Sequence, residues 1–216
     1  SNNWYQGDGY YAIENFLSTA TGDYSTAIGS STTASGTYST AMGGSTTASG
    51  DDSTAMGAST EASGSYSTAM GWLTKASGIA STAMGENATA SGTSSTAMGN
   101  GTEASGDDST AIGSGSTASG RYSTAMGWLT KASGYISTAM GYETTASGDT
   151  STAMGSGTTA SDFGSLVIGR YNSSGSSLTS ATSATTFNTA NTAFVIGNGT
   201  GTGVNASDAF KVLFNG

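Results

Sequence analysis

The sequence predicts an all-β solenoid, in which the chain winds through short coils of 14 residues. Three observations predict this class. The motif Ser25-Thr26-Ala27-Ile28-Gly29 occurs in ten copies, 14 residues apart and without a slip, up to Gly155. A second motif, Thr33-Ala34-Ser35-Gly36, recurs half a repeat away with the same period. One phase of the first motif always holds Met or Ile, and every Met of the chain lies there. A fixed period of this kind is the signature of repeat architectures.

The composition taken alone would favour disorder, because only 23 of the 216 residues are Leu, Ile, Val or Phe and the net charge is −9. A disordered low-complexity tract would not hold an apolar residue at one phase of 14 through ten copies. The absence of His and Cys excludes the usual zinc site, a thiol nucleophile and a histidine general base. The acidic balance argues against nucleic acid as a partner. No apolar run approaches the ~20 residues of a membrane-spanning helix. We therefore predict no enzyme, cofactor, metal or membrane insertion for this segment.

The first element, residues 1–18, departs from the repeat and is predicted to be an N-terminal cap over the first coil. It is rich in aromatic residues, and Ile13 lies one residue out of phase with Ile28. Because the chain begins without Met or an apolar leader, we expect a mature or excised fragment.

The central element, residues 19–169, is predicted to form coils of two short strands joined by two tight turns. Each motif ends in Gly, which supplies the positive φ that a tight turn needs. Strand alternation places Ser25 and Ala27 on one face, Thr26 and Ile28 on the other, and Ala34 opposite its two neighbours. A coil of two strands has a thin interior, which Ala and Ser can fill. The Met/Ile slot is then expected to point outward.

Stacked coils would align the slot residues into a continuous apolar ridge, which is an aggregation hazard on a monomer in water. Three-fold association around the ridge would bury it. The predicted trimer interface therefore consists of one residue from each coil: Ile28, Met42, Met56, Met70, Met84, Met98, Ile112, Met126, Met140, Met154 and Ile168. The alternative is a wider solenoid with these residues inside the single chain.

The last element, residues 170–216, is predicted to be a C-terminal β cap that leads to a stalk or a processing site. A Ser/Thr-rich interruption from Tyr171 to Asn191 precedes two predicted strands, 193–199 and 208–216. Gly197 follows Gly169 by 28 residues, which is two repeat lengths and suggests that the solenoid resumes.

The two motifs and their period resemble the YadA-like head repeat of trimeric autotransporter adhesins and related trimeric fibre proteins. The resemblance covers residues 19–169, about 150 of the 216. It implies a left-handed parallel β-roll that forms a homotrimer through the strand carrying the apolar slot. It also implies an extracellular location, on a bacterial surface or in a phage-like fibre. Met often stands where the family pattern has Ile, which preserves apolar volume and loosens packing specificity.

Aromatic residues in the turns are the candidate ligand contacts, because exposed rings can stack on sugars or anchor a protein contact. The predicted partner is a glycan or protein of a host or prey surface. The alternative is that these rings pack on neighbouring turns or seal the seams of the trimer. The candidates are Trp4, Tyr66, Trp72, Tyr122, Trp128, Tyr135 and Tyr142.

Three other functions have weaker support. A flat row of Thr on a solenoid can bind ice, and the candidate row is Thr32, Thr46, Thr60, Thr74, Thr102, Thr130, Thr144 and Thr158. The adjacent outward row, which begins at Thr33, is broken by charged residues such as Glu61 and Lys75. A fibre-borne glycan hydrolase has only scattered carboxylates to support it. The pairs Asp51-Asp52 and Asp107-Asp108 offer oxygen ligands for Ca²⁺, but no Ca²⁺-loop pattern surrounds them.

Overall fold

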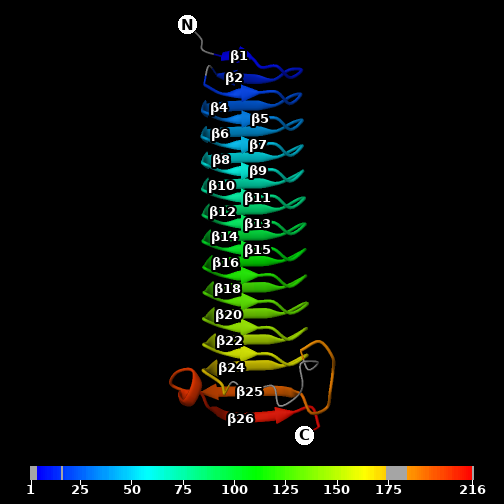
Figure 1. Ribbon diagram of the computed structural model, residues 1–216, viewed down its shortest axis with the longest axis vertical. Coiled ribbons are helices and arrows are strands. Elements are labelled where there is room, and N and C mark those ends of the chain that lie inside the picture. Colours follow the sequence, from blue (N-terminus) through cyan, green and yellow to red (C-terminus); the bar gives the residue numbers. More distant parts are fainter. Residues whose placement is uncertain (1–3, 16, 174–183, 216) are drawn as a thin grey trace. The chain divides into compact units, whose positions relative to one another are not determined.

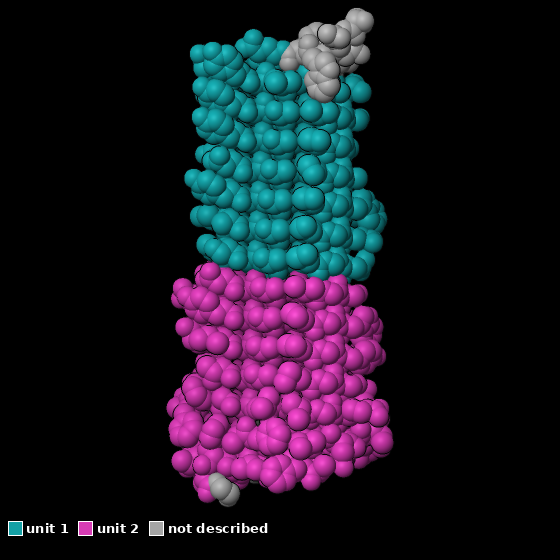
Figure 2. Space-filling model, turned by 180° about the vertical axis from the view of Figure 1, so that it is seen from behind, with its two compact units in different colours: residues 1–104 teal, residues 105–216 magenta. Residues whose placement is uncertain are grey.

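The computed structural model of the chain describes residues 4–15, 17–173 and 184–215, with Trp4 and Tyr5 described by their backbone only. The chain divides into two compact units, Ser1–Ala104 and Ser105–Gly216, which are called unit 1 and unit 2 below (Figure 2). Stacked coils give each unit regular rows of side chains on its surface (Figure 2).

Unit 1 is a β-solenoid in which each coil contributes one strand to each of two sheets (Figure 1). The long-strand sheet contains, in spatial order, β1 (Trp4–Gln6), β2 (Ile13–Asn15), β4 (Thr26–Ser30), β6 (Thr40–Gly44), β8 (Thr54–Ala58), β10 (Thr68–Trp72), β12 (Thr82–Glu86) and β14 (Thr96–Asn100). The short-strand sheet contains β3 (Thr19–Ala20), β5 (Thr33–Ala34), β7 (Thr47–Ala48), β9 (Glu61–Ala62), β11 (Lys75–Ala76), β13 (Thr89–Ala90) and β15 (Glu103–Ala104). Repeat strands pair in parallel with a 14-residue offset, as in Met42↔Met56, and β1 alone runs antiparallel to β2.

Unit 2 has the same two sheets and an irregular C-terminal segment (Figure 1). Its long-strand sheet contains β16 (Thr110–Ser114), β18 (Thr124–Trp128), β20 (Thr138–Tyr142), β22 (Thr152–Ser156), β24 (Leu166–Arg170), β25 (Thr192–Asn198) and β26 (Asp208–Leu213). Its short-strand sheet contains β17 (Thr117–Ala118), β19 (Lys131–Ala132), β21 (Thr145–Ala146) and β23 (Thr159–Ala160), and a 3₁₀ turn, η1, spans Gly203–Asn205. The described residues contain no helix with the length and apolar character needed to cross a membrane.

The predicted all-β class, the 14-residue coil and the resumption of the solenoid are confirmed. Strand β25 pairs in parallel with β24 and aligns Gly197 with Gly169, as the 28-residue spacing indicated. Strand β26 then pairs antiparallel with β25. The chain between β24 and β25 includes residues 174–183 of the predicted interruption, which lie outside the described residues.

The interior of each coil is thin and filled by small side chains. Ser25, Ala27 and Ala34 are fully buried, whereas Thr26 and Ile28 are half-buried on the outer face. Alternation along both strands therefore places the residues as predicted. The alternative of a wider solenoid with the Met/Ile slot inside is wrong, because there is room only for residues of about the size of Ala, Ser and Thr.

The row of Thr that begins at Thr32 lies inside the coils, which corrects its assignment as a surface row. Every member is at most 1% exposed. Thr32 is two residues from Ala34, and residues two apart on a strand share a face. An ice-binding plane needs exposed hydroxyls, so this row cannot form one.

Two columns of Gly let successive coils stack backbone against backbone. Gly57 has a φ of 124°, and a Cβ added to it would lie 2.0 Å from the carbonyl oxygen of Gly71. Gly64, in the second motif, would place a Cβ 2.0 Å from the carbonyl oxygen of Gly78. No side chain fits at either distance, so both motifs must end in Gly.

Side-chain amides take the place of a missing coil where the regular stacking ends. In unit 1, the Asn15 amide donates to the Gly29 carbonyl at 2.9 Å and accepts from the Gly29 N–H at 3.3 Å. In unit 2, Asn172 makes the same pair of bonds with Thr159, at 3.0 and 2.7 Å. An unpaired backbone group at a buried strand edge is costly, and each Asn satisfies one donor and one acceptor.

The first prediction concerns the Gly columns. Gly57→Ala is expected to lower the free energy of unfolding by at least about 2 kcal/mol, because the new Cβ meets a carbonyl oxygen at an unfavourable φ. Gly44→Ala is the matched control, since Gly44 has open space around it and Ala58 occupies the same position one coil later. It should change the stability by less than about 0.5 kcal/mol. Urea unfolding followed by circular dichroism at one protein concentration measures both, and equal midpoints would contradict the argument.

A second prediction compares two buried Thr in adjacent coils of unit 2. The Thr130 hydroxyl donates to the Ser116 hydroxyl at 2.9 Å. The Thr144 hydroxyl is buried with no hydrogen-bond partner among the described residues. Thr130→Val should therefore cost about 1 kcal/mol, whereas Thr144→Val should be neutral or stabilising. Thermal unfolding of the two variants measures the difference, and a larger loss for Thr144→Val would contradict it.

Candidate functional site

The first candidate surface is the outer face of the long-strand sheet, called the apolar face below. Its central row in unit 1 is Ile28, Met42, Met56, Met70, Met84 and Met98, and in unit 2 it is Ile112, Met126, Met140, Met154 and Ile168. Within each unit the strands pair in register, so that each slot residue lies directly beside the next. All are half-buried or exposed in the single chain, with Met42 the most exposed at 38%. The slot residues thus form an apolar row on each unit.

The apolar face of unit 2 extends further than the sequence predicted. Ile196 continues the slot row from Ile168, and the antiparallel strand β26 places Phe210 beside Ile196. Leu166 and Phe194 occupy the neighbouring column, where the repeat has Thr, as at Thr152. In the sequence, Phe194 and Ile196 have the same spacing as Leu166 and Ile168. This similarity could have identified Ile196 as a further member of the slot row. Phe210 has no such signal, because a 14-residue period says nothing about an antiparallel strand.

The turns form two edges in each unit. Edge I consists of the turns that follow the long strands, such as Trp72-Leu73, and edge II of the turns that precede them, such as Thr37-Tyr38. The second turn residue has a positive φ on both edges, 55° at Leu73 and 57° at Tyr38. This conformation costs a residue other than Gly roughly 1–2 kcal/mol. The N–H of Tyr38 bonds to the carbonyl of Asp23 in the preceding coil at 2.8 Å, which helps to hold the turn in place.

The structure brings together two pairs of the predicted aromatic contacts, both in unit 2. On edge I, the rings of Trp128 and Tyr142 stack with their centroids 4.6 Å apart and their planes 17° apart. On edge II, Tyr122 and Tyr135 meet edge-to-face at 5.7 Å. The guanidinium of Arg121 lies 4.7 Å from the centroid of the Tyr122 ring.

The remaining predicted aromatic contacts are in unit 1. Trp72 lies on edge I and is 51% exposed, and Tyr66 lies on edge II and is 66% exposed. Neither ring packs against another aromatic ring within the part of the chain that the structure describes. Trp4 is in β1, but its side chain lies outside the description.

The surroundings of Tyr142 suppress ionisation of its hydroxyl. Desolvation raises the pKa of Tyr142 above its ordinary value of 10.0, and the charges of Glu143 and Tyr171 raise it further. Tyr142 is therefore a neutral hydrogen-bonding group at physiological pH.

A cluster of four tyrosines, which is not among the candidate contacts named above, lies on edge II of unit 1. The rings of Tyr24 and Tyr38 stack at 4.8 Å with their planes 9° apart, and Tyr10 and Tyr11 lie 5.9 and 5.6 Å from Tyr24. A hydrogen bond to Tyr11 is the main cause that raises the pKa of Tyr10. Because Tyr24 and Tyr38 are 14 residues apart, the period itself could have identified them as neighbours. Tyr10 joins them because the N–H of Tyr24 bonds to its carbonyl at 2.7 Å.

Two carboxylates in the edge II turns accept hydrogen bonds from the backbone. One oxygen of Asp51 accepts the N–H of Thr37 at 2.9 Å, and Asp149 accepts that of Tyr135 at 2.8 Å. In each case the Asp supports the turn of the preceding coil. Among the described residues, no group of three or more His, Cys, Asp or Glu side chains is arranged to hold a metal ion.

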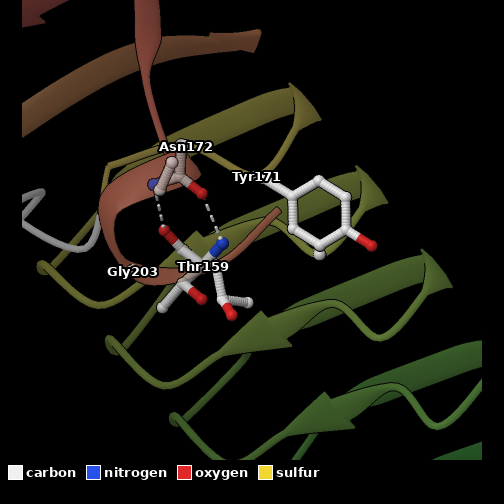
Figure 3. A pocket seen from close by; sticks show the side chains of 7 residues that line it. Thr159, Tyr171, Asn172 and Gly203 are labelled. Atoms are coloured by element: carbon white, nitrogen blue, oxygen red, sulfur yellow. Dashed lines mark hydrogen bonds between the residues drawn. The ribbon is translucent and has the colours of Figure 1, made fainter. Parts of the chain in front are cut away.

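A small pocket of about 80 Å³ opens where the C-terminal segment of unit 2 returns to the coils (Figure 3). The ring of Tyr171 occupies the space that a side chain at Gly157 would need, and Asn172 reaches Thr159 beside it. The other lining residues are Thr202, Gly203 and Ala206. The pocket has room for only a few water-sized groups.

One family model matches most of the chain. It is described as the YadA head domain repeat (2 copies), and it matches residues 20–46, 48–74, 76–102, 104–130 and 132–170. These segments contain nearly all of the coils described above. No curated protein gives a significant match to the chain.

Proposed function

This chain belongs to the YadA head domain repeat family, and from that membership we propose that three copies associate through the apolar face and present their edges for attachment. The family indicates a structural segment similar to a trimeric autotransporter adhesin, which is exposed on the bacterial surface. The finer assignments, namely the residues at the interface and those that meet a target, rest on the surfaces of this chain.

The observation that carries the proposal is the apolar row on each unit. Each slot residue is Met or Ile, and each is held outside by the thin interior. Finishing the burial of one such half-buried side chain is worth about 1 kcal/mol, and the row offers one in every coil. Contiguous exposed apolar surface of this kind marks an association site.

The opposite sheet has the character of a solvent-exposed surface. Its outward positions carry charges such as Glu61 and Lys75, which form an exposed ion pair at 3.1 Å in adjacent coils. An exposed pair of this kind contributes little to stability. Association through the long-strand sheet therefore leaves this polar sheet in water.

The irregular ends have the features of caps, and we assign residues 1–18 and 170–216 this role around the repeats at 19–169. Antiparallel strands lie at the edge of the long-strand sheet in both segments, β1 in unit 1 and β26 in unit 2. Asn15 and Asn172 satisfy the strand groups that would otherwise lack a partner.

The proposed trimer is tested with paired substitutions on the two sheets of the same coils. Met70→Lys/Met84→Lys should abolish trimers or shift them to a lower mass, because it brings like charges together where the three chains would meet. Ser77→Lys/Ser91→Lys, on the short-strand sheet, adds the same charge and should leave the mass unchanged. Light scattering coupled to size exclusion measures both. A well-folded monomer for the unsubstituted chain would contradict the proposal.

The attachment role is assigned to the aromatic edges. Trp128 and Tyr142 present a stacked pair on edge I that is 42% and 44% exposed, a platform suited to a sugar or an apolar protein side chain. The Tyr122–Tyr135 pair gives edge II of the same unit an equivalent platform.

A glycan array tests which edge meets the target. Trp128→Ala/Tyr142→Ala should reduce a glycan signal about tenfold if edge I carries it, while the trimer mass stays unchanged. Tyr122→Ala/Tyr135→Ala serves as the matched variant on edge II and should retain the signal. Loss in the second variant alone would assign the contact to edge II. Full signal in both would remove these rings from the attachment site.

A further inference from the structure

We propose that the C-terminal end of the apolar face in unit 2 sets the axial register between the associated chains. The contact residues are Leu166, Ile168, Phe194, Ile196, Phe210 and Val212, and the partner is a second copy of this chain. This inference rests on the proposed association through the apolar face.

The repeated part of the face cannot define a register by itself. A shift of one coil, about 4.8 Å along the stack, replaces Met140 with Met126 or Met154. The neighbouring column is just as uniform, because Thr124, Thr138 and Thr152 follow one another in it. Between Met126 and Met154, a chain displaced by one coil therefore meets the same side chains in the same geometry. Strands without distinct positions are prone to slip in this way.

The C-terminal end differs from the repeat in both columns. Leu166 and Phe194 replace Thr in the side column, so that the apolar face widens there from one column to two. Val212 and Phe210 extend the two columns on β26, beside Phe194 and Ile196. Phe194 and Phe210 also meet edge-to-face, with ring centroids 6.1 Å apart. No coil of the repeat reproduces this arrangement.

The exposed ring of Phe210 makes a displaced register costly. It is 51% exposed in the single chain, more than any slot residue of the repeat. In the aligned assembly the Phe210 rings of all copies lie at one level and can bury one another. A slip of one coil carries one Phe210 ring past the end of its partners, or places it level with Ile196 of a partner instead of with another Phe210 ring. Loss of this aromatic contact penalises the slip, whereas exchanging one Met for another does not.

The N-terminal end of the separate row in unit 1 also disfavours a slip. The register of β2 and β4 places Asn15 at the position beside Ile28. A polar residue therefore stands next to the first apolar residue of the slot row. The amide of Asn15 is already engaged with Gly29. A slip in this direction would cover a polar group with an apolar side chain and gain little burial.

Disulfide mapping between two marked chains measures the register, because the natural sequence contains no Cys. A tagged chain carrying Met140→Cys is coexpressed with an untagged chain carrying Met126→Cys, Met140→Cys or Met154→Cys. Mild oxidation and peptide mass mapping give the yield of tagged–untagged links at offsets of minus one, zero and plus one coil. We expect the yield to peak at zero offset.

The same profile is then measured with Phe210→Thr or Phe194→Thr in both chains. Thr keeps the strand propensity and, at position 194, restores the residue that the repeat has in that column. The ratio of offset to aligned links should rise about tenfold, the effect of removing a large buried apolar contact. Ile112→Thr removes an apolar side chain from the repeated part of the row, and its profile should stay peaked.

The outcomes separate this inference from the proposed trimer. A flat profile for the natural chain, with trimer mass retained, would overturn the register assignment alone. So would a profile that stays peaked in both Phe variants, when circular dichroism shows that they are folded. A monomeric natural chain would overturn the association itself. Assembly that is lost in both Phe variants but kept in Ile112→Thr would show that the end holds the chains together without selecting a register, which also contradicts the inference.

Discussion

Close stacking of successive coils through their backbones is the constraint on which the rest of this molecule depends. At Gly57 and Gly64 the carbonyl of the next coil lies where a Cβ would be. One extra residue in any coil would move a side chain into such a position, so an insertion or deletion is not tolerated between the two Gly columns. This explains why ten copies of the first motif follow one another without a slip. The period is a steric requirement of the stack as well as a record of duplication.

The same stacking decides where the apolar residues must lie. A two-strand coil encloses a thin interior, in which Ser25, Ala27, Ala34 and Thr32 are each at most 1% exposed. The largest apolar side chains that are fully buried, Val167 and Val195, belong to the two C-terminal coils and not to the regular repeat. Met and Ile are therefore excluded from the interior and form a row on the surface. The proposed association would bury this row, since the chain has no internal core large enough to receive it.

Periodicity and alternation were sufficient to predict the coil, its two faces and the in-register slot row. They also place Trp128 and Tyr142 in neighbouring coils, because the two residues are 14 apart, and the stacked contact follows from that placement. The same rule applied to Thr32 would have placed it inside with Ala34, so its assignment to the surface was an avoidable error. The position of Phe210 could not be predicted. It depends on an antiparallel return through residues 199–207, and neither the direction of that strand nor its register has any signal in the period.

A repeating sequence does not itself define where the stack of coils ends. In this chain the ends are marked by single residues that differ from the repeat at particular positions of the coil. Glu14 pairs with Ala27 in the register of β2 and β4, and its carboxylate accepts the N–H of Ala20 at 2.7 Å. Asp162 stands where the second motif has Gly, and its carboxylate accepts the N–H of Thr192 at 2.9 Å. In the middle of the stack, Glu14 would bury a charge among the Ala residues of the interior, and Asp162 would clash with the backbone of the next coil. Each is suited to an end, where one carboxylate oxygen accepts a backbone N–H.

Because the ends are encoded separately from the coils, whole coils can be added or removed without rebuilding either end. The sequence records such an event. Residues 51–78 and 107–134 are closely similar and are offset by four repeats, and both contain Trp-Leu-Thr-Lys-Ala-Ser-Gly. A duplicated block of coils keeps the Gly columns, the interior rows and the slot in phase, so it extends the stack at almost no structural cost. It also lengthens the uniform part of the apolar face and multiplies the registers that two copies could adopt. If the copies associate as proposed, a longer array depends more strongly on the few residues at its ends that the repeat does not copy.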